Sequence, residues 1–302
     1  MADVYSAKKN KSDSDDTKQG VLYLVATPIG NLGDMTSRAI ETLMSVDIIA
    51  AEDTRNSIKL LNHFDIHTPM TSYHEHNRVQ KAYELVESML DGKNVALISD
   101  AGMPAISDPG QELVAMAHER GIAITVVPGA SACISALAIS GMPSRRFCFE
   151  GFLPTDKKQL EEVLGDLTRE KRTIIIYEAP HRLAKTLRLL GRRLGLDRRI
   201  CIVKELTKLH ENTMHTTLGE ASEHFESFEA RGEYVLVIEG LDVQKQKQMR
   251  IQSWMSMPVE SHMQIYLDEG HEKKEAMRMV AKDRGVSRRD IYNELEKNHI
   301  EP

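Results

Sequence analysis

Four short segments hold the residue types that could bind a small charged ligand, and each follows a run of apolar residues. They are Ala26–Gly33 (ATPIGNLG), Ala51–Arg55 (AEDTR), Ser99–Gly110 (SDAGMPAISDPG) and Val127–Ser131 (VPGAS). Glycine lets the backbone approach a ligand closely, and a carboxylate accepts hydrogen bonds from hydroxyl or amino groups. Any one segment could be an ordinary turn. Four of them at the ends of four predicted strands favour a ligand cleft.

These segments lack the glycine patterns of phosphate-cradling loops. Gly30 and Gly33 do not have the spacing of a dinucleotide-binding GxGxxG motif, and the chain contains no GxxxxGK[ST] motif. Cofactors that are held mainly by their phosphates are therefore disfavoured.

The elements that must position these loops alternate between strands and helices. The strands are apolar throughout rather than at every second residue, which is typical of a parallel sheet covered on both faces. Such sheets bind ligands beyond the carboxyl ends of their strands, where the four loops lie. The predicted strands span residues 21–26, 47–51, 95–99 and 124–127, and the predicted helices span 35–45, 54–64, 78–90 and 110–120.

Similar patterns predict a second α/β domain, which a strand at 147–152 connects to the first. Its other strands are predicted at 173–177, 200–204 and 234–238, and its helices at 157–169, 180–195 and 219–230. The predicted domains are a disordered tail (1–19), an N-terminal α/β domain (20–144), a second α/β domain (145–241), and a linker with a small all-helical domain (242–302).

The composition is that of an ordinary globular protein. The 302 residues have a net charge of −6, with 41% hydrophobic and 28% charged residues, which excludes a chain that is disordered as a whole. Cys133, Cys148 and Cys201 form no CxxC pair, so we expect no disulfide scaffold or zinc site and a reducing, cytoplasmic compartment. The uncharged stretch 121–144 is broken by Pro128-Gly129, which favours a strand and a buried helix over a membrane span.

Nine short motifs occur along the chain in a characteristic order. They are ATPIGNLGD (26–34), AAEDTR (50–55), HEHN (74–77), SDAGMPAISDPG (99–110), VPGASA (127–132), EGFLP (150–154), YEAPHR (177–182), KELTK-HE (204–211) and GEYVLVIEG (232–240). In this order they resemble the ribosomal RNA small subunit methyltransferase I family of the tetrapyrrole-methylase superfamily. The resemblance covers about residues 20–240 and extends to the tail.

This resemblance implies a fold, a cofactor, a partner and a reaction. The implied fold has two α/β domains with a cleft between them for S-adenosyl-L-methionine, in a homodimer. The implied reaction transfers a methyl group to the ribose 2′-oxygen of a cytidine in the decoding region of 16S rRNA. The implied partner is 16S rRNA or the 30S subunit. From the residues themselves we expect no metal, because His74 and His76 have no third ligand at a convincing spacing, and no membrane partner.

The loop from Asp100 to Gly110 is the strongest candidate for contact with the cofactor. Asp100 could accept hydrogen bonds from it, whereas helix capping or turn formation explains Asp108 better. Met103 stands where the family often has Thr, so only a backbone contact is expected there. The predicted cofactor-binding residues are Pro28, Gly30, Asp100, Ala101, Gly102, Met103, Ile106, Ser107, Pro128, Gly129, Ser131 and Tyr177.

Methyl transfer is an in-line displacement, in which positioning supplies much of the acceleration. A neutral ribose hydroxyl is a poor nucleophile, so a nearby base or positive charge would help. Each candidate side chain also has a structural interpretation, as a member of an ion pair or a loop. The candidate catalytic residues are Glu52, Asp53, Arg55, His74, Asn77, Arg182, Lys204 and Glu205, with Glu205 orienting Lys204. The sequence does not identify the base.

Two basic segments could contact RNA despite the negative net charge. Residues 182–199 hold seven Lys or Arg against one acid, and residues 273–289 hold seven against two. Most basic runs are solvated helix faces. The second run, however, has two predicted helices, 272–284 and 287–297, which resemble a helix-turn-helix capped by Ser287. The predicted RNA-binding residues are Arg188, Arg192, Arg193, Lys273, Lys274, Arg278, Arg288 and Arg289.

Other interpretations stay open. The helical tail could be a packing or dimerisation module, with an inner face formed by Ala276, Met279, Val280, Val286, Ile291 and Leu295. The chain as a whole could be a tetrapyrrole-type methyltransferase of small molecules, or a nucleic-acid-binding protein without catalytic activity. The two basic segments disfavour the first of these functions, and the four coordinated loops disfavour the second.

Overall fold

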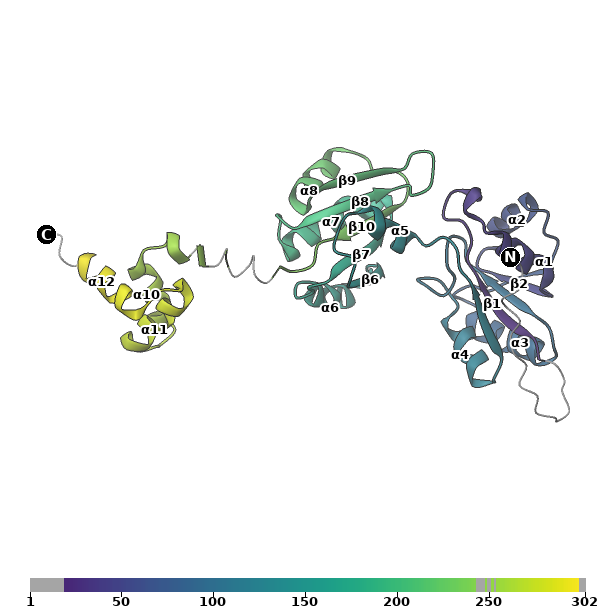
Figure 1. The fold of residues 1–302 in the computed structure, drawn as a ribbon, viewed down its shortest axis with the longest axis horizontal. Coiled ribbons are helices and arrows are strands. Elements are labelled where there is room, and N and C mark those ends of the chain that lie inside the picture. The colour runs from purple at the N-terminus through teal and green to yellow at the C-terminus, as the bar shows by residue number, and fades with distance from the viewer. Residues whose placement is uncertain (1–18, 243–247, 249–250, 253, 299–302) are drawn as a thin grey trace, which may run out of the picture. The chain divides into compact units, whose positions relative to one another are not determined.

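The structure is a computed structural model that describes residues 19–242, 248, 251–252 and 254–298. It consists of two compact units, one ending at Glu239 and one beginning at Gly240 (Figure 1). The predicted disordered tail, apart from residue 19, and most of the predicted linker lie outside the described residues.

The first sheet of the larger unit is parallel throughout, as its continuously apolar strands predict. Its strand order is β3-β2-β4-β1-β5. Strand β3 was not predicted, because its three residues show no apolar run. The strands are β1 (Val21–Val25), β2 (Ile48–Ala51), β3 (Met70–Ser72), β4 (Val95–Ile98) and β5 (Ala123–Val127).

Helices cover both faces of this sheet and bury alternate residues of its strands. Along β4, Val95 and Leu97 pack on the side of α3 and α4, whereas Ala96 and Ile98 pack on the side of α1 and α2. Burial on both faces is the physical reason for the continuous apolar runs. The helices are α1 (Ser37–Ser45), α2 (Thr54–His63), α3 (Arg78–Leu90) and α4 (Gln111–Glu119), with a short 3₁₀ turn η1 (Leu32–Asp34).

The second sheet is mixed, with the order β6-β7-β10-β8-β9. Only β6 and β7 pair in parallel; the other neighbours are antiparallel. The polar edge strand β9 was not predicted. The strands are β6 (Phe147–Phe152), β7 (Thr173–Glu178), β8 (Arg199–Lys204), β9 (Asn212–Thr217) and β10 (Tyr234–Ile238).

Two separate cores cover the faces of this second sheet. Helices α6 (Lys157–Leu167), α7 (Pro180–Leu194) and α8 (Leu218–Ser227) cover one face. Helix α5 (Ala132–Ile139) covers the other, although it precedes the predicted domain boundary after residue 144. The position of that boundary stays a prediction.

The smaller unit is helical and has a core of its own. Helices α10 (Val259–Asp268), α11 (Lys273–Arg284) and α12 (Arg288–Asn298) bury apolar side chains against one another. Gly285 ends α11 with φ +69°, and the Ser287 hydroxyl accepts a hydrogen bond from the Asp290 amide (3.2 Å) at the start of α12. Met277 belongs to the buried core in place of the predicted Met279.

Candidate functional site

The loops after β1 and β4 are joined at the carboxyl edge of the first sheet. The Thr27 amide donates to the Gly102 carbonyl (2.9 Å), and the Gly102 amide donates to the Thr27 carbonyl (3.1 Å). Gly102 has φ +84°, and an added Cβ would lie 3.1 Å from the Ile29 side chain. A side chain at position 102 would therefore disturb both the backbone and its neighbour.

A cavity of about 350 Å³ lies beside these loops, which is a normal size for a ligand site. Seven of the residues predicted to bind the cofactor line this cavity: Ala101, Gly102, Met103, Ile106, Ser107, Ser131 and Tyr177. Residues outside the predicted site line it too, among them Ile29, Asp108, Phe152, Glu178, Val203, Leu206 and Glu233. The second sheet thus contributes a wall of the cavity that loop patterns in the first domain could not reveal.

Five predicted cofactor-binding residues do not line this cavity: Pro28, Gly30, Asp100, Pro128 and Gly129. Two of them serve loop packing instead. An added Cβ at Gly129 would lie 2.9 Å from the Ala26 side chain, and one at Gly30 would lie 2.4 Å from the Lys208 side chain. Asp100 accepts hydrogen bonds from the Asp53 amide (3.2 Å) and the Asn56 side chain (3.0 Å), which ties its loop to the start of α2.

Asp108 is the carboxyl group that gives the cavity its charge. Burial, followed by the nearby charge of Glu52, raises the pKa of Asp108 to about 7. No described Lys, Arg or His side chain forms an ion pair with it, and none lines the cavity. The local sequence favours helix capping or turn formation for Asp108, since Pro109 and a helix follow it. The burial of its carboxyl group depends on tertiary structure, which that local pattern does not reveal.

The other two carboxylates of the cavity each have a cationic partner. The side chain of Glu178 is fully buried and lies 3.4 Å from Nε of Arg182. Glu233 lies 2.9 Å from Nζ of Lys208. Among these three, Asp108 is the carboxyl group without a cationic partner in the described chain, and a cationic ligand would stabilise its ionised form.

Tyr177 links the two walls of the cavity. Its hydroxyl accepts a hydrogen bond from the Cys133 amide (2.9 Å) at the start of α5, and burial raises its pKa. Its ring meets those of Phe149 and Phe152 edge to face, at centroid distances of 4.8 and 5.7 Å. Phe152 is 54% exposed, so an aromatic surface is available beside the cavity.

The acidic and basic side chains after β2 follow the ion-pair interpretation. Asp53 lies 2.6 Å from Nη2 of Arg55 and caps α2 by accepting from the Arg55 amide (2.9 Å). These bonds lower the pKa of Asp53 to about 2. Burial, followed by the charge of Asp100, raises the pKa of Glu52. The Arg55 side chain is 87% exposed.

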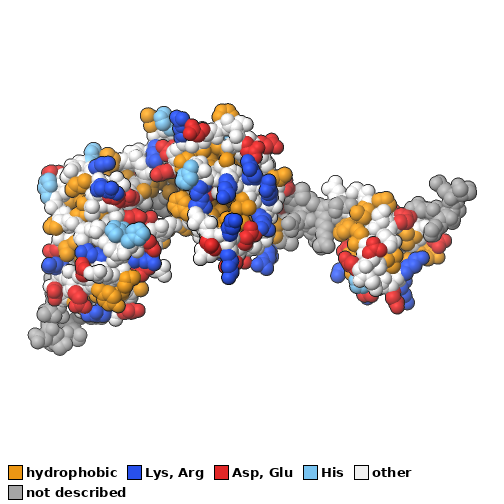
Figure 2. Space-filling view, turned by 180° about the vertical axis from the view of Figure 1, so that it is seen from behind, with side chains coloured by type: hydrophobic (Ala, Val, Ile, Leu, Met, Phe, Trp, Pro, Cys, Tyr) orange, Lys and Arg blue, Asp and Glu red, His pale blue; other side chains and the backbone are white. Residues whose placement is uncertain are grey.

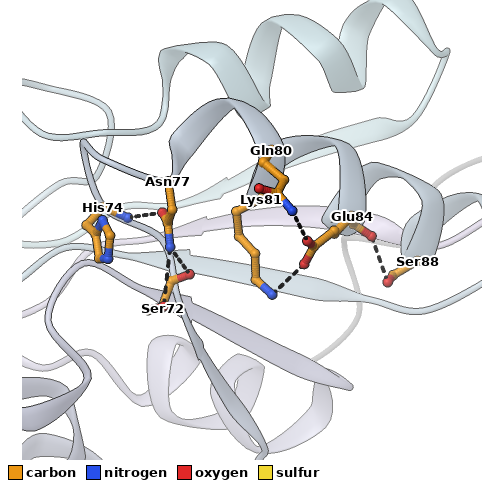
Figure 3. Close-up of polar contacts among 7 residues, drawn as sticks. All are labelled: Ser72, His74, Asn77, Gln80, Lys81, Glu84 and Ser88. Carbon is orange, nitrogen blue, oxygen red and sulfur yellow. Dashed lines mark hydrogen bonds and ion pairs between the residues drawn. The ribbon is translucent and has the colours of Figure 1, made fainter.

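His74 and Asn77 form a turn that begins α3 (Figure 3). The Asn77 Oδ1 accepts from the His74 amide (2.8 Å), and the Asn77 Nδ2 donates to the Ser72 carbonyl (3.2 Å). These bonds give Asn77 a structural explanation. Nδ1 of His74 is buried without a hydrogen-bond partner in the described part of the chain. Within the same described ranges, no group of three or more His, Cys, Asp or Glu could hold a metal ion.

Arg182 is held in place by the second sheet. Besides its contact with Glu178, its Nη2 donates to the Leu153 carbonyl (2.8 Å). Its guanidinium therefore secures the segment after β6 and supports the salt-bridge interpretation.

Within the described residues, the hydrogen bonds of the Glu205 carboxylate go to partners other than Lys204, so that Glu205 orients Lys204 stays a prediction. The Glu205 carboxylate accepts from Nζ of Lys208 (2.9 Å) and from the Glu233 amide (2.8 Å). The reason is a tight turn: Glu205 has φ +51°, and the Lys208 amide donates to its carbonyl (2.9 Å). That turn brings Lys208 back over the carboxylate.

The predicted RNA-binding arginines of α7 are partly neutralised by neighbouring helices. Arg188 lies 2.6 Å from Glu226, and Arg193 pairs with Glu161. Arg192 is exposed and forms no ion pair with a residue that the structure describes. Figure 2 shows Lys and Arg side chains on one face of the second α/β half of the chain, interspersed with acidic ones.

The predicted RNA-binding residues of the smaller unit lie together. A groove of about 580 Å³ between α11 and α12 is lined by Lys273, Lys274, Met277, Arg288, Arg289 and Tyr292. Arg278 lies outside this lining and is 3.4 Å from Glu275. None of the described lining residues is acidic.

None of the helices in the described ranges has the length and apolar character needed to cross a membrane.

Relatives of known name and structure share this sequence and fold. Residues 21–222 match the family model of the tetrapyrrole (corrin/porphyrin) methylases. The chain is 48% identical to ribosomal RNA small subunit methyltransferase I of Halalkalibacterium halodurans over 91% of this chain and 94% of the relative. It is 47% identical to the protein of the same name from Synechocystis sp., over 90% and 96%.

A solved structure confirms the fold. Uroporphyrin-III C-methyl transferase from Thermus thermophilus, complexed with S-adenyl homocysteine, has a TM-score of 0.51 and 18% identity, over 73% of this chain and 97% of that one. With two relatives of nearly the same length at almost half identity, the family is established. The chain belongs to the ribosomal RNA small subunit methyltransferase I family of the tetrapyrrole methylases.

Proposed function

We propose that this chain transfers a methyl group from S-adenosyl-L-methionine to the ribose 2′-oxygen of a cytidine in the decoding region of 16S rRNA. The names of its relatives support an RNA of the small ribosomal subunit as the substrate. The observation that carries the proposal is the cavity at the sheet edge, which seven of the residues predicted for the cofactor line.

The chemistry of this cavity fits the cofactor. S-adenosyl-L-methionine is a sulfonium cation, and Asp108 is the carboxyl group without a cationic partner among the described residues. The rings of Phe152 and Tyr177 offer a surface against which an adenine ring can pack. Ile29, Ile106 and Val203 offer apolar surface. When bound, the cofactor supplies the methyl group.

The reaction forms a bond between the ribose oxygen and the methyl carbon and breaks the bond between that carbon and sulfur. The hydroxyl proton passes to a base or to water. Arg55 and Lys204 are the candidate cations for the developing oxygen charge. Arg55 is exposed, and Lys204 ends β8 next to the cavity residue Val203.

Methyl transfer to unmodified 30S subunits tests the proposal. We expect label from S-adenosyl-L-methionine to reach one cytidine ribose of 16S rRNA, as mapped by nuclease digestion and mass spectrometry. Naked 16S rRNA, assayed in parallel, shows which form is the substrate. Absence of label from every ribose in both substrates would overturn it.

A homodimer and a cytoplasmic location belong to the same proposal. Val126, Ile134 and Ile139 lie on β5 and α5 and are 48%, 50% and 43% exposed, which supports contact with a second copy. We expect sedimentation to give a dimer for the wild type and a monomer for Ile134→Glu. A monomeric wild type would exclude this arrangement.

A further inference from the structure

We propose that the groove between α11 and α12 binds single-stranded RNA, with one unstacked base against Tyr292 and phosphates on the cations around it. The inference rests on the proposed function, which makes RNA the substrate. It specifies the form of RNA that the helical unit takes.

The groove has two walls of the same design. Lys273, Lys274 and Met277 come from α11, whereas Arg288, Arg289 and Tyr292 come from α12. Residues three and four apart share one face of a helix, so each wall places two cations one turn before a large side chain. The result is an apolar floor between two pairs of positive charges.

Tyr292 is 53% exposed although the preceding residue, Ile291, is fully buried in the core. Ile291 thus fixes α12 to the unit, while the tyrosine ring is left at the surface of the groove. Met277, on the opposite wall, is buried and gives the groove its apolar side. An exposed aromatic ring among cations is the usual arrangement for stacking bases of a single strand.

The positions of the cations argue for a ligand rather than for helix stability. Lys273 and Lys274 begin α11, and Arg288 and Arg289 begin α12. The start of a helix carries a partial positive charge, which repels cations and attracts phosphate. No ion pair joins any of the four to an acidic residue of the described chain. The Asp290 carboxylate accepts from the Ser287 hydroxyl (2.6 Å), and the bonds from Ser287, followed by the charge of Arg289, lower the pKa of Asp290.

A single strand fits this groove better than a duplex. The helix-turn-helix interpretation would insert α12 into a major groove, but the major groove of duplex RNA is too deep and narrow for that. In a duplex the bases are also stacked on each other, so none is free to pack on Tyr292. Unpaired RNA offers both the base and the phosphates.

Binding of a fluorescein-labelled RNA tests the inference with the full-length chain and no cofactor. One probe is an unpaired RNA of about 12 nucleotides; the other is the same RNA annealed to its complement. The variants are Tyr292→Ala and Tyr292→Phe, with Tyr83→Ala as a matched control, because Tyr83 is 56% exposed on α3. Thermal unfolding checks that all variants fold.

We expect Tyr292→Ala to weaken single-strand binding about 10-fold, which corresponds to the loss of one stacked base. Tyr292→Phe and Tyr83→Ala should bind within about 2-fold of the wild type, and duplex binding should not change with Tyr292→Ala. Unchanged single-strand binding by Tyr292→Ala, or an equal loss on the duplex, would overturn the inference. Methyl transfer to 30S subunits is measured separately, so failure of the proposed reaction is distinguishable from failure of this groove.

Discussion

Two cavities of this chain have opposite charge. The cavity at the edge of the first sheet, about 350 Å³, has in Asp108 a carboxyl group without a cationic partner, and no cation among its described lining residues. The groove of the helical unit, about 580 Å³, has four cations and no described acid. A cationic cofactor and an anionic polymer need these opposite fields. The net charge of −6 describes neither site.

The two basic segments differ in how many of their cations are already bound by other residues. In residues 182–199, four of the seven cations pair with carboxylates, and Arg198 is buried, donating to the carbonyls of Leu194 and Glu239 (both 3.1 Å). In residues 273–289, Arg278 pairs with Glu275, and Arg284 is buried and donates to His262 (3.3 Å). Five cations of the second segment stay available for RNA. An equal number of cations in two segments therefore does not mean an equal number available to a ligand.

The largest effect is expected from Asp108, because the charge contrast between the two cavities depends on this one carboxyl group. Asp108→Asn removes the unpaired carboxylate, and we expect affinity for S-adenosyl-L-methionine to fall on the order of 30-fold at pH 8, as for the loss of one partner of a buried charge pair. Affinity for S-adenosylhomocysteine, whose sulfur is uncharged, should fall much less. Isothermal titration calorimetry with both ligands measures the difference, and equal losses for both would show that Asp108 does not respond to charge.

The pH dependence has a definite sign. Because the pKa of Asp108 is raised to about 7 in the free protein, the group is largely protonated below that pH and cannot attract a cation. Wild-type affinity for S-adenosyl-L-methionine should therefore rise with pH through about 7 and level off above it, with release of a proton on binding. The same raised pKa makes the free protein lose stability as pH rises toward 7, a loss that Asp108→Asn removes. A wild-type affinity that is flat from pH 6 to pH 8 would contradict this assignment.

Much of the fold could be predicted from sequence because both faces of the inner strands of the first sheet are buried. Continuous apolar runs identified β1, β2, β4 and β5 to within a residue or two, although the edge strand β5 is largely exposed. Strands β3 and β9 were not predicted, because neither has a continuous apolar run. Strand β3 is only three residues long, and β9 is a polar edge strand. Edge strands bury little surface, so their sequences need no apolar pattern.

The site was less predictable, because its walls come from distant segments. The loop from Asp100 to Gly110 was identified by its glycine and its place after a strand, and six of its residues line the cavity. The role of Asp108 within this loop was not, because the burial that raises its pKa depends on tertiary structure. Likewise, Glu161 and Glu226, which neutralise cations of α7, belong to α6 and α8. Counting the charged residues along one helix does not reveal partners that lie on other helices.

A smaller effect is expected from the groove of the helical unit. Arg288→Ala with Arg289→Ala removes two cations that form no ion pair with described residues, so we expect binding to 16S rRNA to weaken about 10-fold and its logarithmic salt dependence to fall by about 2. Filter binding over a series of KCl concentrations measures both quantities. An unchanged salt dependence would mean that these arginines do not contact phosphate.

The smallest effect is expected from α7, where the two arginines to be replaced are already paired with carboxylates. Arg188→Ala with Arg193→Ala breaks the pairs with Glu226 and Glu161, and exposed pairs of this kind contribute only about 0.2–1 kcal/mol each to stability. We expect RNA affinity to change less than about 2-fold, because each arginine already shares its charge with a carboxylate. Arg192→Ala alone is the informative control, since Arg192 has no such partner in the described chain. If the paired arginines matter more for RNA than Arg288 and Arg289, then RNA must displace Glu161 and Glu226, and α7 rather than the helical unit would be the principal RNA surface.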